Sequence, residues 1–321
     1  MQAIMLYEQG GPEVLKLEER PTPQPGPGEA LVQVAAAGVN YIDIYRRSGW
    51  YKLTLPCGMG SEGAGTVLQA GAGVTAVAPG DRVAWIAGAH SYATHTVIPA
   101  DKLAPVPEKV TLEQAAATIL QGITADVLTS RTYSLKPGDR CLVHAAAGGV
   151  GRLLCQVAKM RGAHVIGTVS SEAKAQAARE SGADEAIIYT KMDFEAEVKR
   201  ITGGKGVNVV YDSVGKDTFD KSLACLAPLG TMVLFGQSSG FVPPFDIQRL
   251  AGGSLFLTRP VVFHYVNARE DLLRHAAQVL GWVAEGKLKL HIDRKFSLAE
   301  AAQAHMALAS RQTMGKLLII P

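Results

Sequence analysis

Several features that would define a class of function are scarce in this sequence. Its 321 residues include only four cysteines, and no two of them form a C-x-x-C pair. We therefore expect neither a disulfide framework nor a structural zinc lobe. The 32 basic and 29 acidic residues nearly cancel, without a block of lysine or arginine, so no nucleic acid or membrane surface is expected as a partner.

Long apolar runs are also missing. Charged residues and glycines interrupt every stretch before it reaches the roughly 20 residues of a membrane span. No secretory leader is recognisable before the first predicted strand, 2–6. The separated cysteines, Cys57, Cys141, Cys155 and Cys225, are typical of buried, reduced thiols. We therefore expect a cytoplasmic protein.

The most informative segment is 140–151, in which an apolar run breaks into a turn of small residues, RCLVHAAAGGVG. Ala146, Gly148 and Gly151 occupy the three positions of the G-x-G-x-x-G pattern, with alanine in place of the first glycine. Such a turn between a strand and a helix lets backbone N–H groups approach a pyrophosphate. An isolated match is equally compatible with an ordinary tight turn, so its surroundings decide.

Those surroundings are a long alternation of strands and helices. Strands are predicted at 140–145, 164–168, 186–189, 207–212, 230–235 and 254–258, and helices at 149–161, 171–181, 193–202 and 216–226. The strands are short and mostly apolar, which is typical of a parallel sheet covered on both faces. Six strands in this order predict an α/β fold with a doubly wound, six-stranded Rossmann sheet that binds a dinucleotide.

The N-terminal part has a different pattern of short strands and turns. Strands are predicted at 2–6, 15–19, 30–36, 63–70, 82–87 and 91–98, with a proline-rich connector at 21–28. Their close spacing favours a partly closed barrel or a sandwich. Two helices follow, one from Thr111 through Ala117 and one from Thr124 to Arg131.

The C-terminal part is too small to form a domain alone. After Pro260 the pattern predicts a helix at 268–285, a strand at 291–296, a helix at 298–310 and a strand at 316–320. We expect these elements to complete the N-terminal domain. The predicted domains are therefore 1–123 with 264–321, and an inserted nucleotide-binding domain at 124–263. The cleft between two domains is the usual place for a ligand.

The end of the second strand of the alternating region selects the nucleotide. An acidic residue there would bind the ribose 2′-hydroxyl of NAD, but the segment 167–171 has none. Hydroxyls and a lysine at a helix start suit a phosphate dianion instead. These residues also allow a plainer interpretation, with Ser170 as a helix cap and Lys174 as a solvated side chain. Glu172 is expected to face away from Lys174. We predict NADPH, with its 2′-phosphate near Ser170, Ser171, Lys174 and Tyr189.

The chain resembles a known family over nearly its whole length. The resemblance rests on the segments 10–15 (GGPEVL), 38–49 (GVNYIDIYRRSG), 60–65 (GSEGAG), 144–151 (HAAAGGVG), 211–215 (YDSVG) and 235–239 (FGQSS). It is similar to the NADPH:quinone oxidoreductases, the zeta-crystallin-like branch of the medium-chain dehydrogenase/reductase superfamily. This resemblance implies a Rossmann domain inserted into a GroES-like, partly closed β-barrel domain. It also implies a homodimer that pairs through the edge strand of the sheet.

Two positions depart from the zinc alcohol dehydrogenases of that superfamily. Where those enzymes have a zinc-binding cysteine and histidine, this chain has Asn40 and Ser61. An amide and a hydroxyl are poor zinc ligands. We therefore predict no catalytic metal, and hydride transfer to an acceptor that needs no Lewis acid.

The resemblance also implies which residues contact the cofactor. Beyond those near the 2′-phosphate, they are Asn40, Tyr41, Tyr45, Thr124, Gly148, Gly149, Val150, Val214, Phe235, Gly236, Ser238, Val261, Phe263 and Arg311. Of these, Val261 and Phe263 align with a segment that reaches the cofactor from the returning domain, as does Arg311, although Arg311 could equally be a surface residue that caps its helix. Tyr45 and Tyr51 are assigned catalytic roles in lining the quinone pocket and orienting the carbonyl oxygens. Both could instead be aromatics packed at a domain edge.

The function that these features predict is an NADPH-dependent quinone reductase that transfers a hydride, or electrons, without zinc. A related possibility is an NADPH-dependent enoyl or alkenal reductase acting on a conjugated C=C bond, because the cofactor site would be the same. A third, from a different class, is a non-enzymatic sensor that binds NADPH.

Overall fold

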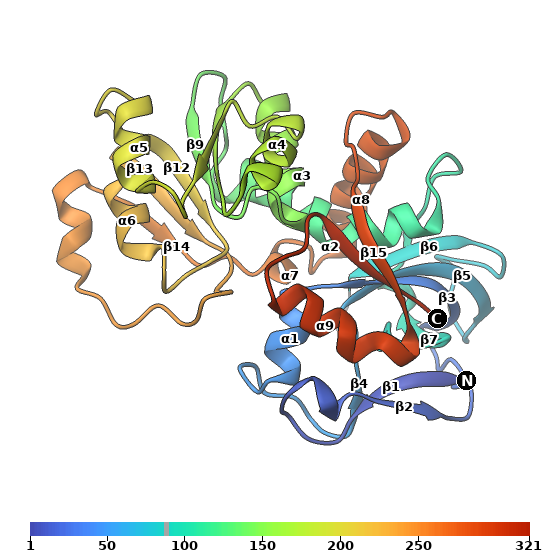
Figure 1. Cartoon of the computed structure of the whole chain (residues 1–321). Coiled ribbons are helices and arrows are strands. Elements are labelled where there is room, and N and C mark those ends of the chain that lie inside the picture. The colour runs from blue at the N-terminus through green and yellow to red at the C-terminus, as the bar shows by residue number, and fades with distance from the viewer. Residues whose placement is uncertain (87–89) are drawn as a thin grey trace. The chain divides into compact units, whose positions relative to one another are not determined.

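The computed structural model describes residues 1–86 and 90–321, which form two compact units (Figure 1). Unit 1 comprises Met1–Ile123 and Tyr265–Pro321, and unit 2 comprises Thr124–His264. The second predicted boundary, 263/264, differs from this division by one residue. The functional roles of the two units remain predictions. Within the described ranges, no helix combines the length and hydropathy needed to span a bilayer.

Unit 2 contains the six-stranded sheet. Its strands are β9 Arg140–Val143, β10 His164–Val169, β11 Glu185–Ile188, β12 Val207–Asp212, β13 Leu226–Leu234 and β14 Phe256–Thr258. Their order is β11-β10-β9-β12-β13-β14, and every pair is parallel. This is the doubly wound order, so the predicted Rossmann sheet is confirmed.

The helices of unit 2 follow the strands in alternation. They are α3 Gly149–Met160, α4 Glu172–Glu180, α5 Phe194–Ile201, α6 Phe219–Ala224 and the 3₁₀ segment η4 Ile247–Gly253. One face of the sheet packs against α5 and α6 through a fully apolar cluster that includes Leu142, Val198 and Phe219. The sequence pattern did not predict η4.

Unit 1 is built on antiparallel strands. They are β1 Gln2–Leu6, β2 Lys16–Glu19, β3 Glu29–Val39, β4 Cys57–Gly58, β5 Glu62–Ala70, β6 Arg82–Ile86, β7 His95–Pro99 and β8 Ala104–Pro105, with η1 Pro12–Val14, α1 Tyr41–Arg47 and η2 Ala100–Lys102 between them. The larger sheet also takes in β15 Ile292–Ser297 and β16 Lys316–Ile320 from the C-terminal part of the chain. Its order is β15-β16-β3-β5-β6-β8, and β7 pairs with β3. Residue 87, the end of the predicted strand 82–87, lies outside the described residues.

The C-terminal segment is part of unit 1. It comprises α8 Arg269–Ala284, β15 Ile292–Ser297, η5 Leu298–Glu300, α9 Ala301–Ala309 and β16 Lys316–Ile320, and it follows the short helix α7 Val262–Tyr265. Strand β16 pairs antiparallel with β3, from Leu317 opposite Val39 to Ile319 opposite Ala37. Segments from the N-terminal and C-terminal parts of the chain therefore share one sheet.

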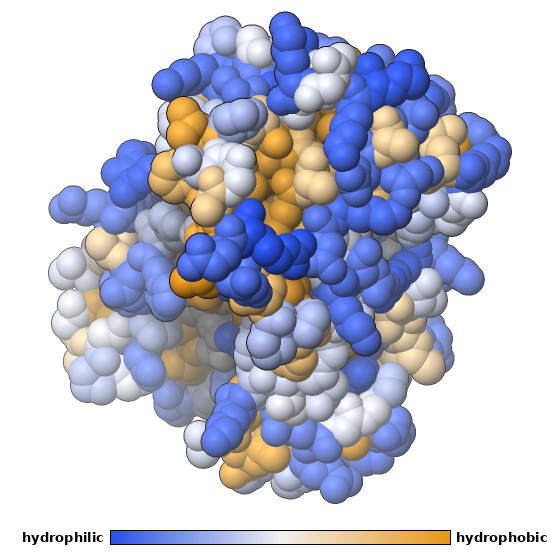
Figure 2. Space-filling view, turned by 90° about the vertical axis from the view of Figure 1, so that its left-hand side faces the viewer, coloured by the Kyte–Doolittle hydropathy of each residue, from blue (hydrophilic) through white to orange (hydrophobic). Residues whose placement is uncertain are grey.

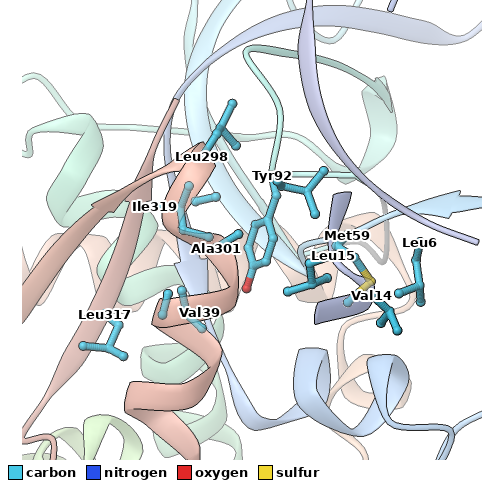
Figure 3. Packing of buried hydrophobic residues seen from close by; sticks show 13 residues of the cluster. Leu6, Val14, Leu15, Val39, Met59, Tyr92, Leu298, Ala301, Leu317 and Ile319 are labelled. Atoms are coloured by element: carbon cyan, nitrogen blue, oxygen red, sulfur yellow. The ribbon is translucent and has the colours of Figure 1, made fainter. Parts of the chain in front are cut away.

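The core of this unit joins residues far apart in the sequence. Figure 3 shows Tyr92 packed between Leu298 and Ala301 of the C-terminal segment and Leu15 and Met59 of the N-terminal part. All belong to one buried cluster, and Tyr92 itself is 0% exposed. Because the two parts bury their apolar surface together, neither would keep this core alone.

Three predicted elements differ in the structure. The helices predicted at 111–117 and 124–131 are one helix, α2 Leu112–Val127, followed by a π-helical segment, Leu128–Thr132. Gly122 lies between the two predicted helices, and its lack of a side chain allows close packing. A Cβ there would lie 2.9 Å from Thr118 Cγ2 and 3.3 Å from Val279 Cβ. The strand predicted at 91–98 is shorter and later, at His95–Pro99.

All four cysteines are free thiols. Cys141, Cys155 and Cys225 are buried, and Cys57 is partly exposed. Burial raises the pKa of Cys155 and of Cys225 to about 12, and raises the pKa of Cys141 well above its usual value. At neutral pH these three side chains are therefore protonated and pack as small apolar groups.

Candidate functional site

The glycine turn of unit 2 joins β9 directly to α3. Gly148 caps the helix, and its N–H donates to the Ala145 carbonyl oxygen at 2.9 Å. Gly151 must be glycine, because a Cβ would lie 2.2 Å from that same oxygen. Ala146, which replaces the first glycine, is buried, and its N–H donates to Thr168 O at 3.1 Å.

This turn suits an anion. The first N–H groups of a helix have no partner within the helix, and its dipole favours negative charge there. The first turn of α3 has no acidic residue. Gly148, Gly149 and Val150, the residues predicted to approach the pyrophosphate, are all partly exposed. The donors present therefore fit a dinucleotide phosphate.

The residues assigned to the 2′-phosphate lie together at the ends of β10 and β11. Ser171 is the N-cap of α4 and accepts from Lys174 N at 3.4 Å, so the cap is Ser171 rather than Ser170. Tyr189, which is 49% exposed, follows β11, and its N–H donates to Val169 O at 3.0 Å. The neighbouring Thr190 hydroxyl donates to Ser170 O at 3.0 Å.

Glu172, the acidic residue at the start of α4, is paired with a neighbour that the sequence analysis did not consider. The Lys191 ammonium hydrogen bonds to its carboxylate at 2.8 Å and lowers the pKa of that carboxyl. A paired carboxylate repels a phosphate less than a lone one does. Lys191 therefore makes this end of the sheet more suitable for a 2′-phosphate.

Two loops at the ends of β12 and β13 contact each other. Ser238 N donates to Ser213 O at 3.1 Å, and Ser239 N donates to Val214 O at 2.8 Å. Gly236 allows this approach, since a Cβ there would lie 2.6 Å from Ser213 O. The structure thus brings together four predicted cofactor residues, namely Val214, Phe235, Gly236 and Ser238.

The remaining predicted residues of unit 2 are more scattered. Thr124 is partly buried on α2, Val261 is 41% exposed, and Phe263 lies on α7. Val261 and Phe263 lie in unit 2, within the predicted domain 124–263.

In unit 1, helix α1 and the loop that follows it form an aromatic cluster of Tyr45, Trp50 and Tyr51. Tyr45 stacks on Trp50 with ring centroids 5.0 Å apart and planes at 8°, and meets Tyr51 edge-on at 5.8 Å. Tyr45 is 7% exposed, whereas Tyr51 is 37% exposed. Gln9 fixes the loop between them by donating to Arg46 O at 2.7 Å and Tyr51 O at 2.8 Å. Of the two predicted catalytic tyrosines, Tyr51 is therefore the more accessible.

Tyr41, at the start of α1, meets the predicted Arg311. The Tyr41 hydroxyl donates to Leu308 O at 3.1 Å. Burial raises the pKa of Tyr41, and the charge and hydrogen bond of the Arg311 guanidinium oppose that rise. Arg311 has φ +58°, a left-handed conformation just beyond α9. These two predicted cofactor residues thus lie together although 270 positions separate them.

Asn40 is held by its own surroundings. Its Nδ2 donates to Glu62 Oε1 at 2.7 Å and to Gly38 O at 3.3 Å, and its Oδ1 accepts from Lys316 Nζ at 2.9 Å and Gln121 Nε2 at 3.1 Å. The amide has no further hydrogen-bonding capacity. A polar contact between Asn40 and a ligand would have to replace one of these bonds.

A zinc ion does not fit this place. Arg46 donates to Ser61 Oγ at 2.8 Å, and the Lys316 ammonium contacts both Asn40 and Glu62. Two cationic side chains thus contact the positions at which a metal would need anionic or neutral ligands. Among residues 1–86 and 90–321, no group of three His, Cys, Asp or Glu side chains could hold a metal.

The sequence analysis missed the polar residues beneath α1. The Asp43 carboxylate accepts from Asn40 N at 3.0 Å, from Tyr92 OH at 3.1 Å and from Ser61 Oγ. Tyr92 OH also lies 3.3 Å from His305 Nε2. The spacing of Asn40 and Asp43 is that of a capping box, and this was the available signal. These contacts fix the helix that carries Tyr41 and Tyr45.

Two family models match the chain. One, for the zinc-binding dehydrogenases, matches residues 149–277, and the other, for the GroES-like domain of alcohol dehydrogenases, matches residues 26–108. A quinone oxidoreductase of Pseudomonas aeruginosa is 45% identical over 99% of both chains. The chain belongs to the quinone oxidoreductase family. The family predicted from the sequence motifs is therefore confirmed.

Solved structures agree with this membership. The Escherichia coli quinone oxidoreductase complexed with NADPH matches with a TM-score of 0.98 and 43% identity, over 100% of both chains. A 2-haloacrylate reductase of Burkholderia sp. is 40% identical over 99% of this chain and 98% of its own length. The family thus includes a protein named for reducing a haloacrylate.

Proposed function

We propose that this protein is an NADPH-dependent quinone reductase that works without zinc. The observation that carries the proposal is the full-length similarity to quinone oxidoreductases, one of them an NADPH complex, in a chain with a suitable glycine turn. When bound, NADPH would supply the hydride, or electrons, from its nicotinamide ring. The part played by this chain is to hold the cofactor and orient the acceptor.

We assign the cofactor to the ends of the strands in unit 2. The N-terminus of α3 would bind the pyrophosphate, and Ser170, Ser171, Lys174 and Tyr189 the 2′-phosphate. Val214, Phe235, Gly236 and Ser238 would border the same nucleotide, together with Thr124, Val261 and Phe263. From unit 1, we propose that the cofactor is contacted by Asn40, Tyr41, Tyr45 and Arg311. Asn40 can do so through its amide only if a hydrogen bond to the cofactor replaces one of its four hydrogen bonds within the protein.

We assign the acceptor to the aromatic cluster of Tyr45, Trp50 and Tyr51. A flat quinone can pack against an exposed aromatic ring, and the Tyr51 hydroxyl can orient a quinone carbonyl by a hydrogen bond. No histidine or carboxylate is needed as a proton donor, because a hydroquinone anion takes a proton from water.

The test is a steady-state assay of the purified protein with NADPH or NADH and 1,4-benzoquinone. We expect turnover with both, and a preference for NADPH that Lys174→Met reduces about tenfold. Lys205→Met, on an exposed loop of unit 2 far along the chain from this cluster, is the control and should leave the preference unchanged. Equal or tighter affinity for NADH in the natural protein would contradict the proposal.

A second candidate is reduction of a conjugated C=C bond, favoured by the 40% identity to the 2-haloacrylate reductase. Side-by-side assays with a benzoquinone, a crotonyl thioester, an alkenal and 2-chloroacrylate would separate the two. A kcat/KM that is higher for any of the C=C substrates than for the quinone would replace the first proposal with the second.

We also propose a homodimer that pairs through β14, and a cytoplasmic location in keeping with four free thiols. Strand β14 is the last strand of its sheet, and an edge strand leaves backbone groups unpaired unless it is covered. Phe256 on this strand is 60% exposed, and Ile247 on η4 is 68% exposed. Figure 2 shows apolar side chains reaching the surface on one face of the molecule. Light scattering after size exclusion should give twice the chain mass, and Phe256→Asp should give monomers.

A further inference from the structure

A chain of four buried polar side chains runs beneath the carboxyl ends of three strands in unit 2. It joins Thr168 of β10, His144 just after β9, Ser222 of α6 and Asp212 of β12, and each residue is at most 1% exposed. His144 Nδ1 lies 2.8 Å from Thr168 Oγ1, and His144 Nε2 lies 2.9 Å from Ser222 Oγ. Ser222 Oγ donates to Asp212 Oδ2 at 3.1 Å. None of these four residues was assigned a role from the sequence.

The direction of every hydrogen bond follows from Asp212. Its Oδ1 accepts from Val214 N at 2.7 Å and Gly215 N at 3.0 Å, and its Oδ2 accepts from Thr218 Oγ1 at 2.7 Å as well as from Ser222. With four donors around it, the group is a carboxylate that only accepts. The single hydroxyl hydrogen of Ser222 is therefore used in the hydrogen bond to Asp212. Ser222 Oγ must accept a hydrogen bond from His144.

This arrangement selects one tautomer of His144. The proton is on Nε2, which donates to Ser222, and Nδ1 is left with a lone pair that accepts from the Thr168 hydroxyl. Burial lowers the pKa of His144, which keeps the ring neutral. The ring is also held edge-on against Phe194, with centroids 5.0 Å apart. The side chain thus has a single orientation and a single protonation pattern.

Three of these four residues lie next to segments that we assign to the cofactor. His144 begins the glycine turn at 144–151, and Thr168 precedes the serines at 170–171. Asp212 fixes the backbone of Val214 and Gly215, and Val214 O in turn accepts from Ser239 N at 2.8 Å. Three separate loops are therefore tied together by one line of hydrogen bonds.

We propose that Asp212 and His144 are positioning residues for the dinucleotide, and that Asp212 sets the tautomer of His144 across Ser222. The inference rests on the proposed NADPH binding by unit 2. Neither residue needs to touch the cofactor. Their role is to fix the relative positions of the loops whose N–H and hydroxyl groups do.

The decisive variant is Asp212→Asn. Its carbonyl oxygen would remain where two backbone N–H groups donate, which places the amide NH₂ toward Thr218 and Ser222. Ser222 must then accept from the amide and donate to His144 Nε2. The proton of His144 consequently moves to Nδ1, which donates to Thr168. A single substitution thus reverses the donor and acceptor in each hydrogen bond from residue 212 to Thr168.

The first readout is the ¹⁵N NMR spectrum of the full-length protein labelled at histidine, with the His144 signals assigned by their loss in His144→Asn. We expect the Nε2–H tautomer in the natural protein and the Nδ1–H tautomer in Asp212→Asn. A purely structural carboxylate would not change the tautomer of a residue two hydrogen bonds away. The Nδ1–H form in the natural protein, or no change in the variant, would overturn the proposal.

The second readout is the Kd for NADPH from fluorescence titration. Asp212→Asn and Thr168→Val, which keeps the shape of threonine but removes its hydroxyl, should each raise the Kd about tenfold. Thr168→Ser keeps the hydroxyl and should retain most of the affinity. Asp217→Asn removes an equal charge from an exposed position in the same loop and should change nothing. Circular dichroism checks that each variant is folded.

The two proposals fail in different ways. If the natural protein binds no NADPH, the proposed function fails and the positioning role fails with it. If the natural protein binds NADPH but Thr168→Val and Asp212→Asn bind it equally well, only the positioning role is overturned. Should Asp212→Asn not fold, the comparison of Thr168→Val with Thr168→Ser still decides.

Discussion

Replacing Lys316 by methionine tests how strongly unit 1 depends on its buried ion pair. Lys316 is 3% exposed and Glu62 is 0% exposed, so the variant leaves a carboxylate without its countercharge in the interior. Removing one partner of such a pair costs about 3–5 kcal/mol. Glu62 would keep two donors, Asn40 Nδ2 at 2.7 Å and Leu120 N at 2.8 Å. We therefore expect the lower end of the range, about 3 kcal/mol of the free energy of unfolding.

The assay is urea unfolding followed by tryptophan fluorescence, because Trp85 is fully buried in the same unit. Lys295→Met is the matched control, since its ion pair with Glu113 lies at the surface and such pairs contribute little. The double variant Lys316→Met with Glu62→Gln should recover part of the loss, because no unpaired charge remains. A loss below about 1 kcal/mol for Lys316→Met, or a double variant no more stable than the single one, would refute the reasoning.

Three further results are expected. Gly151→Ala places a Cβ 2.2 Å from the Ala145 carbonyl oxygen, so the turn must shift and the Kd for NADPH should rise at least about tenfold in a fluorescence titration. Tyr51→Phe should lower kcat/KM for benzoquinone about tenfold while leaving the Kd for NADPH unchanged, and an unaltered kcat/KM would remove its assigned role. Burial, reinforced by the Arg47 charge, lowers the pKa of His305 to about 3, so the unfolded chain binds a proton that the folded one excludes. The free energy that neutral His305 adds to folding is therefore fully present above pH ~6.5 and is lost as the pH falls toward 3. In urea titrations over that pH range, the free energy of unfolding of the natural protein should fall more steeply than that of His305→Asn.

The fold could be predicted to a large extent because its signals are local. An apolar strand, a glycine turn and an amphipathic helix repeat in unit 2, and each repeat lies within about 30 residues. The order of six parallel strands follows from that alternation. The two helices predicted at 111–117 and 124–131 are a single helix because Gly122 packs closely against Val279, and the local sequence pattern does not show a contact with so distant a residue.

The candidate site was predictable only where a motif marks it. The glycine turn is one continuous stretch of sequence. The segment at the end of β10, which has no acidic residue, is another. The pairing of Lys316 with Glu62 and of Tyr92 with His305 joins residues 254 and 213 positions apart, and no spacing rule predicts such contacts. Lys191 was overlooked for a related reason, since its partner Glu172 lies on the preceding repeat.

The burial and protonation of the cysteine thiols have a consequence for an enzyme that reduces quinones. Quinones are electrophiles, and a thiolate adds readily to their conjugated ring. Cys141, Cys155 and Cys225 are buried, and burial raises the pKa of each thiol, so we expect all three to react slowly with the acceptor. Cys57 alone is partly exposed, and burial raises the pKa of its thiol as well. The interior of this protein is thus chemically resistant to the compounds on which we propose it acts.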